Sequence, residues 1–252
     1  MRLLLLNANA SQSITDLVVA AARPLVAPGT EVTGATGRFG PRYIGTRAAY
    51  AIASHAALDA YAAFGQGADA IVLACFGDPG LGALREVASV PVIGMAEAGC
   101  LAAARGGRRF AIVTGGERWI PILTEYVATL GLSGQLAGVY AVAPTGADIA
   151  ANPEGSIALL ADGCRKAVKR FDADVVVLGG AGLAPIAPRV ARMLDFSVID
   201  GLAAAITAAE AAASTPGRCA YPDRLTEPLP AVGLTAELHM MLQRPAGSAA
   251  AP

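Results

Sequence analysis

Short, continuous apolar runs alternate with alanine-rich stretches along the whole chain. The runs contain no polar alternation, which predicts strands buried on both faces of a parallel sheet. We expect strands at residues 3–6, 70–74, 92–93, 110–113, 175–178 and 198–199. The alanine-rich stretches predict helices at residues 48–64, 81–87, 120–130, 156–171 and 201–213. A further helix follows the first strand, with Ser11 or Ser13 as its cap and Asp16 in its opening turn. This β-α-β succession predicts an α/β fold.

The chain contains one internal repeat with a period of about 105 residues. ADAIVLACFGDPG, from residue 68, resembles ADVVVLGGAGLAP, from residue 173, and RLLLLN, from residue 2, resembles RFAIVT, from residue 109. One repetition of this length predicts two pseudo-symmetric, Rossmann-like domains with parallel sheets and a cleft between them. We expect the first domain at residues 1–97 plus about 206–240, the second at 98–205, and a disordered tail at 244–252.

Composition and charge exclude several classes of protein. Hydrophobic residues make up 54% of the 252 residues, and the net charge is −1 without any run of Lys or Arg. We therefore expect no nucleic-acid partner and no membrane surface. The apolar runs are far shorter than the roughly 20 residues of a membrane-spanning helix. The opening MRLLLLNANAS lacks the longer apolar stretch of a signal peptide, so we expect a cytoplasmic protein.

Metal and redox motifs are also missing from the sequence. The four cysteines are too widely spaced for a CxxC motif, and the two histidines give a histidine-based metal site little to be built from. We therefore expect no metal site. Cys100, Cys164 and Cys219, together with His55 and His239, are expected to be structural or incidental.

Ligands of parallel sheets bind beyond the carboxyl ends of the strands. With two facing domains, the loops at residues 7–11, 75–80, 114–117 and 179–182 converge on one cleft. Small residues and free N–H groups in such loops suit a carboxylate or an enolate-like intermediate. The candidate binding residues are Asn9, Ser11, Phe76, Gly77, Thr114, Gly115, Gly116 and Ala181, with Phe39, Tyr43 and Trp119 in loops near the cleft mouth.

Cys75 is the candidate reactive residue. A buried cysteine at a strand end is often only a small apolar filler. At a strand-to-helix turn, however, a helix dipole and free N–H groups lower the pKa of a thiol and activate it. The repeat places Gly180 opposite Cys75. The acids near strand ends, Asp78, Glu97, Glu117 and Asp200, are better explained as helix caps or supporting partners than as proton donors.

The segment ACFGDPGL at residues 74–81 carries a specific resemblance. Together with LLNANAS, FGP at 39–41, PVIGMAEA, RFAIVT, VVLGGAGL and VIDG at 198–201, it resembles the hydantoin and allantoin racemases of the aspartate/glutamate/hydantoin racemase superfamily, over about four-fifths of the chain. The resemblance implies two pseudo-symmetric α/β domains, no cofactor, and two cysteines flanking an acidic carbon. One cysteine removes the proton and the other protonates the opposite face.

The sequence departs from the family pattern at several positions. Cys75 matches the first cysteine. Residues 179–182 read Gly-Gly-Ala-Gly where hydantoin-type members read Gly-Cys-Ala-Gly, so Gly180 stands in place of the second cysteine. Ala8 replaces a proline, and Thr114-Gly115-Gly116 replaces a Thr-Thr or Thr-Ser pair. Because one thiol is missing, ordinary two-base racemisation requires water or another residue in its place.

These observations favour an isomerase that acts at the acidic α-carbon of an amino-acid derivative or a hydantoin-like substrate, with Cys75 as the acid/base. One alternative is a lyase, a single-cysteine decarboxylase resembling the arylmalonate decarboxylases, although their cysteine matches the second position. Others are a maleate-type isomerase that uses thiolate addition and a catalytically silent carboxylate-binding protein. The expected partner is a small carboxylate or cyclic ureide. Relatives often form homo-oligomers, and the sequence leaves this open.

Overall fold

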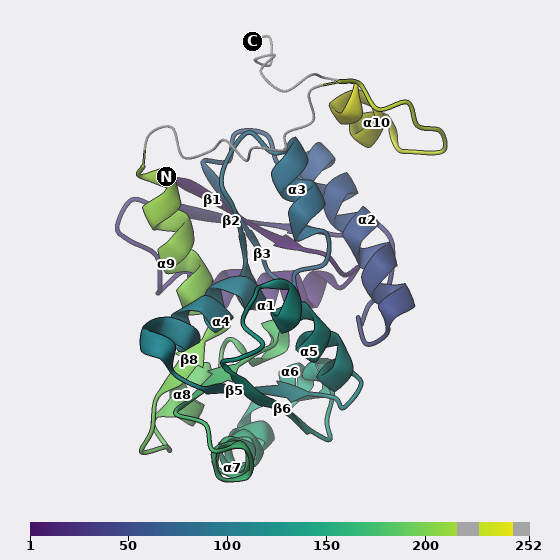
Figure 1. Ribbon diagram of the computed structural model, residues 1–252. Coiled ribbons are helices and arrows are strands. Elements are labelled where there is room, and N and C mark those ends of the chain that lie inside the picture. Colours follow the sequence, from purple (N-terminus) through teal and green to yellow (C-terminus); the bar gives the residue numbers. More distant parts are fainter. Residues whose placement is uncertain (216–226, 244–252) are drawn as a thin grey trace.

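Two four-stranded parallel sheets form the framework of the protein (Figure 1). The computed structural model describes residues 1–215 and 227–243. The first sheet has the order β2-β1-β3-β4 and the second the order β6-β5-β7-β8. The strands are β1 (Arg2–Asn7), β2 (Glu31–Thr36), β3 (Ala70–Leu73), β4 (Val92–Gly94), β5 (Phe110–Gly115), β6 (Leu136–Val142), β7 (Val175–Leu178) and β8 (Val198–Asp200). The predicted α/β class with two parallel sheets is confirmed.

The two halves repeat each other down to single contacts. The backbone N–H of Arg2 donates to Asp69 Oδ2 at 2.6 Å, and that of Arg109 donates to Asp174 Oδ2 at 2.7 Å. Each aspartate N–H returns a bond of 2.8 Å to the carbonyl of the same arginine. The AD pair of the repeat therefore fixes the start of the central strand pair in both sheets.

Helices cover the sheets and join them. They are α1 (Gln12–Ala22), α2 (Arg47–Phe64), α3 (Leu81–Val87), α4 (Met95–Ala104), α5 (Trp119–Thr129), α6 (Gly146–Ala151), α7 (Pro153–Phe171), α8 (Ala187–Ala191), α9 (Gly201–Ala213) and α10 (Ala236–Leu242), with 3₁₀ turns at Arg105–Gly107 and Ala181–Leu183. Helix α4 runs from the first sheet to the second. Helix α9 leaves β8 and packs against α4 and β3 (Figure 1), so these two helices join the halves.

The structure corrects three local expectations. Ser11 occupies the N-cap position of α1, but its side chain makes no cap bond and lies 3.0 Å from Ser13 Oγ instead. Asp16 lies beyond the first turn, where it accepts a bond of 2.8 Å from Gln12 Nε2. Trp119 is the first residue of α5 and not part of a loop, because the turn after β5 takes only three residues.

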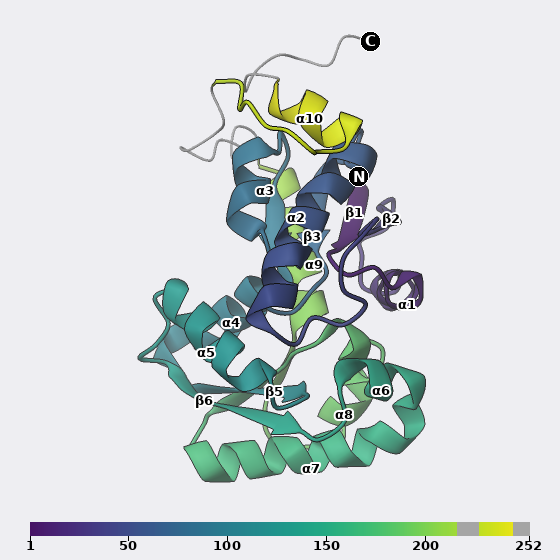
Figure 2. The ribbon, with the colours of Figure 1, turned by 90° about the vertical axis from the view of Figure 1, so that its right-hand side faces the viewer.

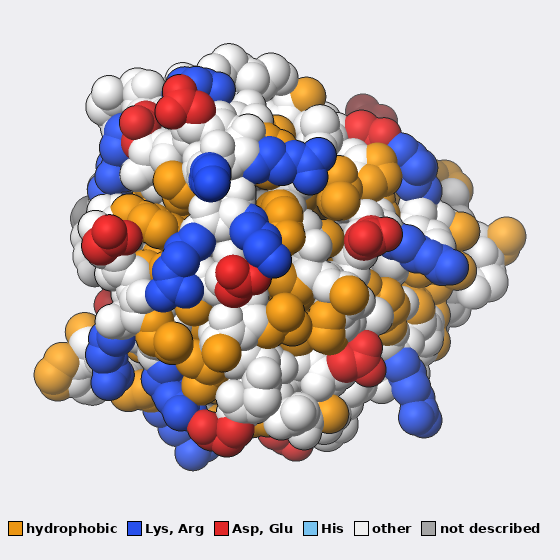
Figure 3. Space-filling model, turned by 90° about the horizontal axis from the view of Figure 1, so that it is seen from below, with side chains coloured by type: hydrophobic (Ala, Val, Ile, Leu, Met, Phe, Trp, Pro, Cys, Tyr) orange, Lys and Arg blue, Asp and Glu red, His pale blue; other side chains and the backbone are white. Residues whose placement is uncertain are grey.

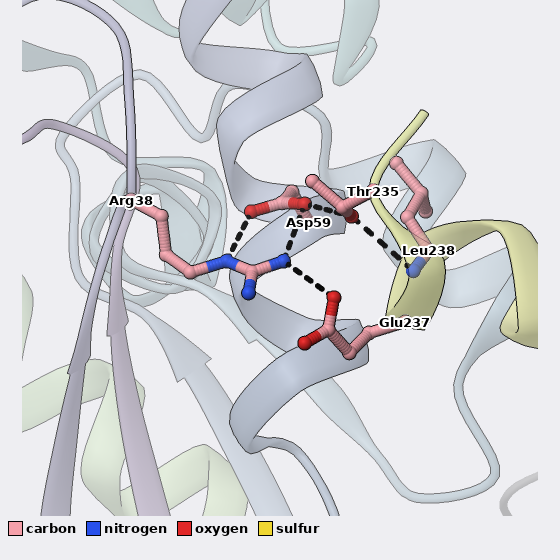
Figure 4. Close-up of polar contacts among 5 residues, drawn as sticks. All are labelled: Arg38, Asp59, Thr235, Glu237 and Leu238. Atoms are coloured by element: carbon pink, nitrogen blue, oxygen red, sulfur yellow. Dashed lines mark hydrogen bonds and ion pairs between the residues drawn. The ribbon is translucent and has the colours of Figure 1, made fainter. Parts of the chain in front are cut away.

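The C-terminal segment packs on the first half through α10 and α2 (Figure 2). An ionic cluster anchors it (Figure 4). Arg38 donates to both carboxylate oxygens of the fully buried Asp59, at 2.7 and 2.8 Å, and to Glu237 at 3.2 Å. Asp59 also accepts from the hydroxyl of Thr235, whose Oγ1 caps α10. The predicted disordered tail, residues 244–252, and Cys219 lie outside the described residues.

The surface formed by α7 carries charges of both signs side by side (Figure 3). Lys166 pairs with Asp162 along α7, and Arg189 of α8 pairs with Glu154. Within residues 1–215 and 227–243, no helix has the length and apolarity to cross a membrane. The same residues contain no cluster of three or more His, Cys, Asp or Glu side chains that could hold a metal ion.

Candidate functional site

A cleft lies where the strand-end loops of the two halves meet. The segment between β2 and α2 passes between the halves (Figure 2). Its residues Arg42, Tyr43 and Ile44 line the cleft. The cleft is lined by Asn9, Ile14, Arg42, Tyr43, Ile44, Cys75, Phe76, Thr114, Gly115, Trp119, Gly146, Ala147, Gly180, Ala181, Gly182 and Leu183. Its volume of about 70 Å³ equals roughly five to seven water-sized positions, so it suits a small ligand.

Cys75 follows β3 and is 6% exposed in the cleft wall. Burial raises the pKa of its thiol, and the nearby carboxyl of Asp78 adds to this effect. The expected lowering of the thiol pKa is therefore wrong. The physical reason is that α3 begins only at Leu81, six residues further on, so apolar burial outweighs any helix dipole. The thiol is protonated at neutral pH.

Gly180 lines the same cleft. Its φ of 147° is one that L side chains rarely adopt. A Cβ at this position would lie 2.9 Å from Cδ1 of Leu183. The backbone here is therefore suited to glycine, and the Leu183 side chain occupies part of the space beside it.

An asparagine network shapes the loop after β1. The buried Asn7 donates from Nδ2 to Asn9 Oδ1 at 3.0 Å and to Thr15 Oγ1 at 3.0 Å. Asn9 Oδ1 also accepts from the Ser11 N–H at 2.9 Å. Because both bonds use the oxygen of Asn9, its amide Nδ2 is left as a donor at the cleft wall. Asn7 is a positioning residue that the sequence reasoning missed, although its polarity at the end of an apolar strand was a signal.

Two further groups in the wall have polar atoms available to a ligand. Thr114 is only 4% exposed, and its hydroxyl has no hydrogen-bond partner among the described residues. A buried hydroxyl without a partner costs free energy, which favours a ligand atom there. Arg42 is exposed, and no ion pair of the described chain uses its guanidinium. Tyr43, hydrogen-bonded to Trp119, has its pKa raised by burial.

Phe76 ties the cleft to both halves. Its ring lies so close to Gly179, Gly99 and Gly201 that a Cβ on these glycines would come within 2.3, 3.8 and 3.1 Å of ring carbons. Gly179 follows β7, and Gly201 starts α9. The three glycines therefore form a slot that receives the residue next to Cys75, which fixes the thiol relative to the second half.

The structure brings together most of the predicted site residues. Asn9, Tyr43, Cys75, Phe76, Thr114, Gly115, Gly180 and Ala181 all line the cleft. Ser11, Phe39, Gly77 and Gly116 do not line it. Phe39 stacks edge-on against His55 with ring centroids 4.8 Å apart. Gly77 lies under Trp119, and Gly116 lies beside the hydroxyl of Tyr43.

Several wall residues were not predicted. They are Ile14, Arg42, Ile44, Gly146, Ala147 and Leu183, whereas Gly182 belongs to the predicted 179–182 loop. Arg42 follows the FGP motif directly, so the motif was a usable signal. Gly146 and Ala147 come from the start of α6, a short helix whose pattern the sequence does not reveal.

Three of the acids near the strand ends act as helix caps or paired groups, as expected. Asp200 caps α9 by accepting from the Leu202 N–H at 2.9 Å. Glu97 forms an ion pair with Arg85. Asp78 is buried and contacts the start of α4. None of the three lines the cleft.

Comparison with known proteins agrees with this geometry. The Asp/Glu/Hydantoin racemase family model matches residues 3–209. The hydantoin racemase of Paenarthrobacter aurescens is 33% identical over 214 residues, which cover 83% of this chain and 90% of that protein. Together with the two α/β halves and the cleft between them, these matches identify the class of protein as racemase-type enzymes. The chain belongs to the Asp/Glu/Hydantoin racemase family.

The relatives and solved structures place the chain near one branch of the family. Hydantoin racemases of Pseudomonas sp. (strain NS671) and Rhizobium meliloti are 35% and 37% identical, but the matched part spans only 58% and 61% of their lengths. The allantoin racemase of Klebsiella pneumoniae superposes with a TM-score of 0.80 at 33% identity, over 96% of this chain and 98% of that one. That of Pseudomonas fluorescens superposes with a TM-score of 0.83 at 28% identity, over 92% and 100%. The chain is therefore hydantoin/allantoin racemase-like.

Proposed function

We propose that the protein is a racemase or epimerase that exchanges the proton on an acidic α-carbon, with Cys75 as its acid/base. The observation that carries this proposal is the composition of the cleft wall. Among the described residues it contains one thiol and no carboxylate, imidazole or lysine side chain. Membership of a racemase family supports the same reaction class.

The proposed reaction uses one protein base. Because the resting thiol is protonated, a hydroxide ion first takes its proton and becomes water. The thiolate of Cys75 then takes the α-proton, an S–H bond forms, and the electron pair of the broken C–H bond moves into an enolate. The amide of Asn9 and the hydroxyl of Thr114 donate to the enolate oxygen. Water on the Gly180 side then protonates the carbon, and the resulting hydroxide removes the proton from the thiol. When Cys75 returns the proton instead, the configuration is retained.

We propose a substrate that is small and carries an anionic group. The cleft volume of about 70 Å³ favours a small ligand, and Arg42 is the one cation among the described wall residues, with no acid among them to oppose it. Amino-acid derivatives and hydantoins with a carboxylate side chain fit this description. The relatives named as hydantoin and allantoin racemases support a cyclic ureide core.

A decarboxylase is the second candidate. Loss of carbon dioxide leaves a carbanion that needs only one proton, and the buried, protonated thiol of Cys75 opposite Gly180 can supply it. The superposition with arylmalonate decarboxylase, with a TM-score of 0.59 at 21% identity, shows the fold alone.

A substrate panel separates these functions. Hydantoins, their N-carbamoyl amino acids, arylmalonates and maleate are incubated in D₂O with the wild type and with Cys75→Ala. We expect α-deuteration of the first two classes by the wild type only. Carbon dioxide release from the malonates supports the lyase, and fumarate formation supports the maleate-type isomerase. If wild type and variant are equally inert throughout, the enzymatic proposal fails and ligand binding alone remains.

A further inference from the structure

Asp78 lies three residues after Cys75, in the turn that carries the thiol. Its backbone N–H donates to the carbonyl of Cys75 at 2.9 Å, which closes that turn. Asp78 adopts a φ of 53°, in the left-handed region that non-glycine residues seldom occupy. Its side chain is buried. A strained backbone and a buried carboxyl next to the proposed reactive group suggest a role beyond the loop itself.

The carboxyl of Asp78 makes three hydrogen bonds to other elements. The N–H groups of Ala96 and Glu97, in the first turn of α4, donate to Oδ1 at 3.0 Å and to Oδ2 at 2.8 Å. The hydroxyl of Tyr126, on α5, donates to Oδ2 at 2.6 Å. Helix α4 links the two sheets, and α5 belongs to the second half. Asp78 therefore ties the Cys75 turn to the connection between the halves and to the far half.

The sequence around this tie is adapted to it. A Cβ at Gly94 would lie 2.3 Å from Asp78 Oδ2, so glycine is needed for the carboxyl to reach α4. The neighbouring Gly77 carbonyl accepts from the hydroxyl of Tyr50, on α2, at 2.6 Å. The Cys75 turn is thus held from α2, α4 and α5 at once.

We propose that Asp78 is a positioning residue, which holds the thiol of Cys75 in the orientation needed for proton transfer at the cleft. This inference rests on the proposed role of Cys75. It also means that Tyr126, in the second half of the molecule, helps to set the orientation of the thiol through Asp78. Small displacements of a catalytic group lower rates strongly, so a tie of this kind is expected to affect turnover more than substrate binding.

The charges around Asp78 give a second, independent readout. The titratable groups around the Asp78 carboxyl are Cys75 in its own loop, Glu97 and Cys100 on α4, Tyr126 on α5 and Tyr50 on α2. Glu97 is itself paired with Arg85. The negative charge of Asp78 opposes ionisation of the Cys75 thiol. Removal of this charge is therefore expected to favour the thiolate.

The test compares Asp78→Asn, Tyr126→Phe and a control. Two assays are used. The first measures kcat and KM for α-deuterium exchange. The second measures the pH midpoint of Cys75 alkylation by iodoacetamide, monitored by peptide mass spectrometry. For Asp78→Asn we expect kcat to fall at least about tenfold with KM within about twofold. The alkylation midpoint should move to lower pH. Tyr126→Phe keeps the carboxyl but loses one tie, so kcat should fall by less.

Asp200→Asn is the matched control, because it removes another carboxyl that caps a helix and is partly buried, away from the cleft wall. It should leave kcat and the alkylation midpoint unchanged. The proposal is overturned if Asp78→Asn behaves as wild type in both readouts, or if Asp200→Asn produces the same changes. If Asp78→Asn does not fold, an unchanged kcat in Tyr126→Phe overturns it. The alkylation readout needs no turnover, so it distinguishes the two failures: a wild type that is inactive on every substrate contradicts the proposed function, whereas an alkylation midpoint that is the same in Asp78→Asn and wild type contradicts the effect of Asp78 on the thiol.

Discussion

At the scale of one residue, Gly180 bears most directly on the proposed reaction with a single thiol. Its φ of 147° is a backbone conformation that favours glycine, and the adjacent Leu183 side chain leaves little space for a Cβ. Restoring a cysteine there therefore has a conformational cost as well as a chemical gain. The sequence predicted the vacancy opposite Cys75, but backbone torsion is set by the whole loop and was not predictable from one position.

Gly180→Cys and Gly180→Ala separate the two effects. Both substitutions should lower the free energy of unfolding by about 1–3 kcal/mol, because a side chain is forced into a glycine conformation. Only Gly180→Cys should raise the ratio of inversion to α-deuterium exchange, since it adds a proton donor on the second face. Urea denaturation and chiral chromatography measure these quantities. Equal ratios in the two variants would contradict the assigned role of this position.

Arg42 tests the proposed anionic substrate. Arg42→Gln should raise KM for 5-(carboxymethyl)hydantoin by about tenfold or more, since an ion pair in a partly enclosed cleft is lost. KM for the neutral amide of the same compound should stay within about twofold. Arg23→Gln, at the exposed end of α1 and outside the cleft wall, is the charge-matched control. A similar KM change for acid and amide would argue against anion recognition by Arg42.

At the scale of elements, the central strands, the edge strands β4 and β8 and most of the long helices were predictable, whereas the edge strands β2 and β6 were not. β1, β3, β5 and β7 are nearly fully buried, so their sequences are continuously apolar. β2 and β6 were missed because these edge strands remain partly exposed and carry polar or small residues, in EVTGAT and LAGVYAV. An edge strand depends on its partner more than on its own pattern.

The C-terminal helix α10 lies outside the residues matched by the family model and depends on the Arg38–Asp59 pair. Asp59→Asn should lower the free energy of unfolding by about 2–4 kcal/mol, somewhat less than for a fully enclosed pair because Arg38 is partly exposed. Glu237→Gln, at the exposed side of the same cluster, should cost less than about 1 kcal/mol. Equilibrium denaturation in urea measures both. Equal costs would show that burial of Asp59 does not govern the anchor.

At the scale of the whole molecule, the repeat predicted the most. It placed Cys75 and Gly180 in equivalent loops, and the structure brings both to one cleft. The repeat does not predict the contacts that differ between the two halves. The bonds of Asp78 to α4 and α5 and the contacts of the Phe76 slot are of this kind, because they join residues far apart in sequence that meet only in the folded molecule. Such contacts have no local pattern.

The tie between the halves should make stability depend on pH. Burial raises the pKa of Asp78 from its usual value of about 3.8 to about 7, despite three hydrogen bonds that act the other way. The folded state therefore binds a proton that the unfolded chain has released between these values. The stability that comes with this proton is complete below about pH 4 and is lost as the pH rises through 7. Between pH 4 and 8, urea denaturation should show a steeper fall for the wild type than for Asp78→Asn. Parallel pH profiles would contradict the raised pKa.

The central claim, that one thiol exchanges the α-proton, predicts a specific relation between two rates. In D₂O, the enantiomer whose α-proton faces Cys75 should gain α-deuterium faster than it inverts. The thiol that has taken this proton exchanges it for solvent deuterium and returns deuterium to the same face, while only water serves the Gly180 face. Both rates are followed in one sample by NMR and chiral chromatography, with Cys75→Ala alongside. We predict exchange in excess of inversion in the wild type and loss of both in the variant. Exchange and inversion at equal rates from both enantiomers, or exchange that survives in Cys75→Ala, would contradict the account.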